Sequence, residues 1–187
     1  MKRKKLIITA TVFIVLIAAY IKFFAYLPIE GTVVDAETKQ PIEGAAVLVE
    51  WSITPMAWLG MPTTTSYRVI ETMSDKNGKF KINAYVLNPI VNKPHLAIYK
   101  AGYVCWSNEL IFPDKRERTE FKWQSGNYYM LEKFKEQYSY DEHYDFVNGA
   151  ARPYSESEKK HLFLKMYDDG ERAKVIKERD MKMRGYK

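Results

Sequence analysis

Residues 29–49 read IEGTVVDAETKQPIEGAAVLV, and this stretch decides the fold that the sequence predicts. It starts with a β-branched run that favours a strand from Ile29 to Val34. Asp35 to Gly44 then supplies acidic, Thr, Pro and Gly residues, which are typical of a turn. Ala45 to Trp51 resumes an apolar, extended pattern. We therefore predict a strand, a turn and a second strand.

The rest of the chain up to residue 134 repeats this pattern of short strands and turns. Further strands are predicted at residues 67–74, 79–86, 95–99, 103–110, 119–124 and 127–134. Asp75-Lys76-Asn77-Gly78 separates the first two, and Asn-Gly between strand patterns indicates a hairpin. About seven short strands with frequent turns predict a mainly β fold, an antiparallel β-sandwich.

Residues in three turns carry a family resemblance. They are Gly31, Val33, Asp35, Thr38, Pro41, Ile42, Gly44, Ala45 and Val47, then Thr72, Ser74, Asp75, Gly78 and Phe80, then Ala101-Gly102-Tyr103. In this order they resemble the carboxypeptidase regulatory-like domain, a transthyretin-like β-sandwich. The chain departs from the pattern at Lys39-Gln40, where a single Gly is usual, which implies a turn one residue longer. The resemblance implies a structural, stabilising or binding module at residues 28–134, without catalytic residues.

The composition predicts one folded domain with appendages. Of the 187 residues, 47% are hydrophobic and 14% aromatic, which allows a sizeable core. The net charge of +6 comes mostly from five basic residues before Pro28, which leave 24 of the 29 basic residues against 23 acidic ones. The remainder is almost neutral, which argues against nucleic-acid binding.

Residues 1–27 are predicted to be an N-terminal membrane anchor. Lys2-Arg3-Lys4-Lys5 precedes an uncharged run from Leu6 to Ile21, and aromatic residues follow around Lys22. The basic residues would stay cytoplasmic, and the rest would be exported as a single-pass periplasmic or extracellular domain, with the membrane and an envelope protein as partners. The alternative is a signal peptide that is cleaved to release a secreted protein.

The ionisable residues carry no catalytic or metal-binding motif. Cys105 is the only cysteine, which excludes an internal disulfide and favours a buried structural thiol. No histidine has zinc-ligand spacing, and no nucleophile elbow or phosphate loop is present. Glu142-His143-Tyr144-Asp145 is a dense cluster, but a solvated turn is favoured over a metal or acid–base site. We therefore predict no enzyme activity, no cofactor and no metal.

The last part, residues 135–187, is predicted to hold a tyrosine-rich connector and a C-terminal helix. Ser155 to Glu158 is a capping box that would start the helix. Asp168-Asp169-Gly170 would interrupt it, and residues 171–184 alternate in charge like a solvated helix.

Two groups of residues are candidate sites. Met56, Trp58, Leu59 and Met61 would contact a partner protein or lipid headgroups, or else cover an open end of the sandwich or pack under the C-terminal helix. Tyr138, Tyr140, His143 and Tyr144 would form a ligand surface for a sugar or a peptide. The first group suits a non-catalytic interaction or structural module. The second suits an accessory ligand-binding domain that works with an enzyme or envelope complex.

Overall fold

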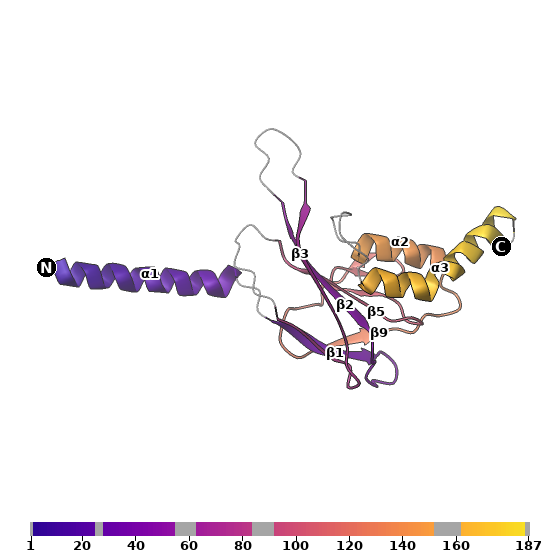
Figure 1. Ribbon diagram of the computed structural model, residues 1–187, viewed down its shortest axis with the longest axis horizontal. Helices are drawn as coiled ribbons and strands as arrows, with labels where there is room; N and C mark the ends of the chain where they lie inside the picture. The colour runs from indigo at the N-terminus through magenta and orange to yellow at the C-terminus, as the bar shows by residue number, and fades with distance from the viewer. Residues whose placement is uncertain (1, 25–27, 55–62, 84–91, 152–161, 186–187) are drawn as a thin grey trace.

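The computed structural model describes residues 2–24, 28–54, 63–83, 92–151 and 162–185 of a sheet-rich chain. Within these ranges there are three helices: α1 (Lys2–Phe24), α2 (Tyr140–Ala151) and α3 (Leu162–Met183). Figure 1 shows that α1 extends away from the sheets, whereas α2 and α3 lie side by side against them.

The described strands form three sheets. The three-stranded sheet has the order β4–β1–β9, with β4 at Lys79–Ile82, β1 at Ile29–Asp35 and β9 at Asn127–Leu131. The four-stranded sheet has the order β3–β2–β5–β6, with β3 at Thr65–Met73, β2 at Ala46–Ile53, β5 at His95–Tyr99 and β6 at Trp106–Ser107. Two short strands, β7 (Leu110–Ile111) and β8 (Arg116–Glu117), pair with each other.

Strand β2 lies between two hydrophobic cores. Val47 and Val49 belong to a cluster that also contains residues of β1, β4 and β9, so the larger two sheets share one apolar core. Ala46 and Leu48, which alternate with them, belong to a second cluster with residues of α2 and α3. Because both faces are covered, β2 is buried from Ala46 to Ser52 and is mostly apolar, unlike a strand with one face in solvent.

The predicted turns are present, but they connect different sheets. Gly78 has a φ of 72°, and the Asp75 side chain accepts hydrogen bonds from the main-chain N–H groups of Asn77 and Lys79. The strands on either side, β3 and β4, pair with β2 and β1 respectively, so the predicted hairpin is wrong. The pairing is also not wholly antiparallel, because β1 and β9 run parallel.

The predicted strand at residues 103–110 is broken into two pieces. The Ser107 side-chain oxygen accepts hydrogen bonds from the N–H groups of Glu109 and Leu110, which turns the chain between β6 and β7. Such local side-chain bonds compete with the ladder of a sheet. No strand is assigned at residues 119–124, which the structure describes in full.

The predicted membrane anchor is wrong: no helix in the described part of the chain is both long and apolar enough to cross a bilayer. A span needs about 20 mainly apolar residues. Within α1, the structure describes side chains only for residues 8–19. The prediction of a transmembrane segment is therefore wrong. So are the predictions that depend on it, namely the membrane and envelope partners and the single-pass localisation.

Helix α3 is continuous through Asp168-Asp169-Gly170, where an interruption was predicted. Its buried residues, Phe163, Tyr167, Glu171 and Val175, recur every four residues and form one face. Gly170 lies beside this face, where an added Cβ would be 2.6 Å from the hydroxyl of Tyr99 on β5. The glycine therefore permits close packing of helix on sheet. The predicted capping box at Ser155 to Glu158 lies outside the described residues.

Candidate functional site

A cluster of ionisable side chains is buried between the four-stranded sheet and the two C-terminal helices. Tyr99 comes from β5, Cys105 from the segment before β6, His143 from α2 and Glu171 from α3. Each is at most 2% exposed. The fold thus brings together residues that are distant in the sequence: Cys105 and His143, for example, are 38 positions apart.

The hydrogen bonds of this cluster fix its protonation. The main-chain N–H of Cys105 donates to Nε2 of His143 at 2.9 Å, so Nε2 carries no proton. Nδ1 then carries the proton and donates to Oε2 of Glu171 at 2.7 Å. The Tyr99 hydroxyl donates to Oε1 of the same carboxylate at 3.2 Å. The neutral imidazole of His143 and the Glu171 carboxylate, which accepts two hydrogen bonds, thus link α2, α3 and the sheet.

The cysteine in this cluster has the properties of a structural thiol. Its Sγ lies 3.8 Å from the carbonyl oxygen of Trp106, whereas Nε2 of His143 is occupied by a main-chain N–H. Burial, and secondarily the Glu171 charge, raises the pKa of the Cys105 thiol well above its usual range. A reactive cysteine needs the opposite, an exposed thiol with a lowered pKa. The predicted buried thiol is confirmed.

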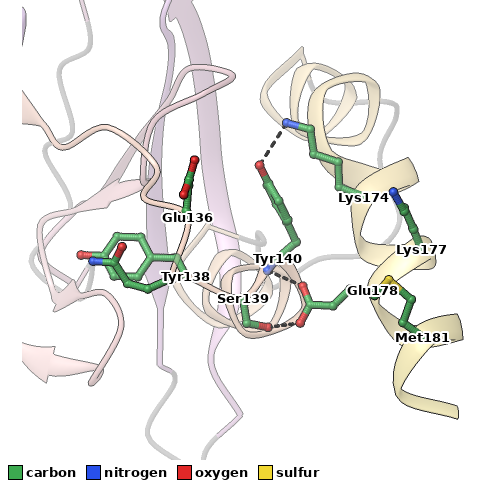
Figure 2. Close-up of a pocket in the computed structure, with 9 residues that line it drawn as sticks. Glu136, Tyr138, Ser139, Tyr140, Lys174, Lys177, Glu178 and Met181 are labelled. Carbon is green, nitrogen blue, oxygen red and sulfur yellow. Dashed lines mark hydrogen bonds between the residues drawn. The ribbon is translucent and has the colours of Figure 1, made fainter. Parts of the chain in front are cut away.

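A surface hollow of about 570 Å³ lies between residues 136–140 and α3 (Figure 2). Its lining consists of Glu136, Gln137, Tyr138, Ser139, Tyr140, Lys174, Lys177, Glu178 and Met181. We call it the helix-side hollow. It brings Tyr138 and Tyr140 of the predicted ligand surface together, but His143 is fully buried and Tyr144 lies against Tyr167 instead.

Glu178, which lines the hollow, caps helix α2. Its Oε2 accepts the main-chain N–H groups of Tyr140 at 2.7 Å and Asp141 at 3.3 Å, and Oε1 accepts the Ser139 hydroxyl (Figure 2). A carboxylate is stabilised by the positive end of a helix. Partial burial raises the pKa of Glu178, but the hydrogen bonds from Ser139, from Lys182 and from the main chain of Tyr140 and Asp141 together outweigh it and leave the pKa below its usual value.

The two tyrosines are held by neighbours. The Tyr140 ring stacks on Phe134 with centroids 4.3 Å apart, and its hydroxyl accepts from Lys174 at 3.2 Å. The Tyr138 hydroxyl donates to Glu132 at 2.9 Å. Both rings therefore shape the wall of the hollow rather than project freely from it.

Besides the exposed amide side chain of Gln137, three lining side chains remain for a ligand. Within the described residues, Lys177 and Glu136 form no ion pair, and both are exposed. Met181 adds an apolar side chain that is 44% exposed. The hollow can therefore offer one positive charge, one negative charge and one flexible apolar contact. Charge patterns on α3 indicated a solvated helix, and no local signal marks the pairing with residues 136–140.

The other predictions of sites have different outcomes. Met56, Trp58, Leu59 and Met61 lie outside the described residues. Among the residues that the structure places, no three His, Cys, Asp or Glu side chains gather as metal ligands.

No protein-family model, curated protein or solved structure matches this chain.

Proposed function

We propose that this protein is a non-catalytic interaction module that binds a polar peptide segment of a partner in the helix-side hollow. The observation that carries this proposal is the set of unpaired groups there. Lys177 and Glu136 suit a segment with both charges, and Met181 suits one apolar side chain. Thioethers are adaptable contacts at binding surfaces.

The absence of catalysis is supported by the buried cluster. The thiol of Cys105 and the imidazole of His143 are the pair that nucleophilic chemistry would use, yet both are sealed from solvent. Their hydrogen bonds serve main-chain and helix contacts. Neither Cys105 nor His143 lines the helix-side hollow.

For residues 28–134 we propose a transthyretin-like β-sandwich related to the carboxypeptidase regulatory-like domain. Support comes from the core that the two larger sheets share, and from the turn chemistry. At the position where a single Gly is usual, Lys39 adopts a φ of 60° in the left-handed region. The departure from the family pattern thus keeps the conformation that glycine normally supplies.

A sugar is the second ligand class that the tyrosine-rich segment suggests. Sugars stack on open aromatic faces, and one face of Tyr140 is already stacked on Phe134. The charged residues of the hollow therefore favour a peptide over a sugar.

The test is selection of phage-displayed random peptides on the full chain, followed by binding measurements with the enriched peptides. Lys177→Glu should weaken binding about tenfold, which is the effect of losing one charged contact. Arg172→Glu is the matched control, because Arg172 is an exposed cation of α3 outside the hollow. Enriched peptides that are indifferent to Lys177→Glu, or a glycan-array ligand that depends on Lys177, would contradict the proposal.

A further inference from the structure

Strand β9 leaves one edge of the three-stranded sheet without a neighbouring strand. It pairs with β1 alone. Just beyond its end, the N–H of Val104 donates to the carbonyl of Glu132 at 2.8 Å, and the N–H of Phe134 donates to the carbonyl of Gly102 at 2.9 Å. Residues 102–104 therefore pair with residues 132–134, which follow β9, and this pairing does not extend past Glu132 into β9 itself.

The remaining edge presents main-chain groups at two positions. The Leu131 carbonyl accepts the N–H of Ala36 and so points toward the β1 side, whereas the Glu132 carbonyl points away from it. Because these directions alternate along a strand, Tyr128 and Met130 direct their N–H and C=O groups away from β1. Their side chains are 68% and 49% exposed. A bare strand edge with large apolar side chains is a template for another strand.

A groove follows this edge. It consists of two adjoining hollows, of about 340 and 380 Å³, which share Trp106, Arg118, Glu120 and Met130. The first reaches Tyr128 and the second reaches Glu132, so the groove spans the unpaired part of β9.

The charges at the Tyr128 end of the groove favour an acidic residue in its occupant. Arg118 and Glu120 pair with each other at 3.0 Å. Lys122, at the Tyr128 end, forms no ion pair with any residue that the structure describes. It is exposed and available to a carboxylate.

We propose that the β9 edge binds an extended peptide of a partner protein by strand addition. The peptide continues the ladder that residues 102–104 begin: it pairs with the main chain of Tyr128 and Met130, and places an acidic side chain near Lys122. Residues 102–104, which pair in this way with residues 132–134, are an example within the chain of an extended segment on the adjoining edge. This site is separate from the helix-side hollow and goes beyond the function proposed above.

Amide hydrogen exchange tests the edge directly. In the full chain alone, the amides of Tyr128 and Met130 should exchange fast, while those of Tyr129 and Leu131 are protected. Adding peptides selected from the phage library should protect Tyr128 and Met130. Protection of these two amides without peptide would overturn the proposal, and if it rises with protein concentration, a second copy is the occupant.

Two substitutions at one position separate main-chain from side-chain effects. Met130→Pro removes an outward N–H without touching the β1 ladder, and should abolish binding of edge-specific peptides. Met130→Thr removes the same apolar side chain but keeps the N–H, and should weaken binding only a few-fold. Equal effects of both, or no enriched peptide that responds to Met130→Pro, would overturn strand addition. Peptides that respond to Lys177→Glu would be unaffected, so failure here is distinct from failure of the hollow.

Discussion

The two faces of the four-stranded sheet are covered in different ways. The face toward β4, β1 and β9 packs in a cluster of apolar and aromatic side chains that includes Val49 and Trp51. The face toward α2 and α3 packs around aromatic rings as well, but it also holds the hydrogen-bonded chain of His143, Glu171 and Tyr99. The first face depends on apolar packing, and the second depends in addition on satisfying buried polar groups.

Carboxylates from distant elements dock the helices on the second face. Glu71 of β3 accepts the N–H groups of Leu162 and Phe163 at the start of α3, and Glu178 of α3 does the same at the start of α2. The free N–H groups of a helix start need such partners. The helices are therefore fixed to the sheet and to each other by specific acceptors, and the helix-side hollow lies where one of these contacts is made.

The largest effect is expected from Glu171→Ala. It leaves the Nδ1 proton of His143 and the Tyr99 hydroxyl buried without their acceptor, and should lower the free energy of unfolding by about 2–6 kcal/mol, about 1–3 kcal/mol for each unsatisfied donor. Chemical denaturation followed by circular dichroism measures it. Asp169→Ala, at an exposed position of the same helix, should change stability by less than about 0.5 kcal/mol. Equal, small effects of both changes would show that the buried chain does not hold the helix.

An intermediate effect is expected from Gly170→Ala. The new methyl would press on the Tyr99 hydroxyl at 2.6 Å and on Cβ of Ala101 at 3.2 Å, so unfolding free energy should fall by about 1–3 kcal/mol.

Gly149→Ala on α2 is the matched control for Gly170→Ala. Nothing lies within 4 Å of its added Cβ, so the better helix propensity of Ala should stabilise the chain by up to about 1 kcal/mol. The same sign at both positions would contradict close packing of α3 on β5.

A smaller effect is expected on the sheet side, at Asp35. Its carboxylate accepts the N–H groups of Thr38 and Glu37 in the turn after β1. The main-chain bond from Thr38 is the largest cause that lowers its pKa, to about 2. The unfolded value is about 3.9. The stabilisation is therefore present above about pH 4 and is lost as the pH falls toward 2.

Asp35→Asn removes this titration. The difference in unfolding free energy between wild type and variant should shrink as the pH falls from 5 to 2. A difference that stays constant over that range would contradict the role of the carboxylate.

Local patterns predicted the sheet side better than the helix side. The strand at His95–Tyr99 has the predicted bounds, and Gly44 and Gly78 have the positive φ that their turns require. The sheet order and the parallel pairing of β1 with β9 could not be predicted, because they join positions nearly 100 residues apart. No short-range periodicity encodes such contacts.

The helix-side hollow could be predicted only in part, because its two sides are far apart in the sequence. Tyr138 and Tyr140 stand out as a local aromatic cluster, and both line the hollow. Glu178 and Lys177 come from a helix whose alternating charges look like a solvated face, and their approach to residues 136–140 depends on tertiary packing. Likewise, Gly170 predicted an interruption of the helix. Its role in close packing is apparent only from the position of the Tyr99 hydroxyl, which no local pattern gives.

Because the ionisable cluster of Tyr99, Cys105, His143 and Glu171 is buried, we propose that it is structural and that function lies on the surface. Cys105 is the only cysteine, and labelling it with a thiol reagent at neutral pH therefore reports on the cluster alone. We expect that the native chain does not react on the time scale of a free thiol and that it reacts fully once unfolded. Rapid, stoichiometric labelling of the native chain would contradict it.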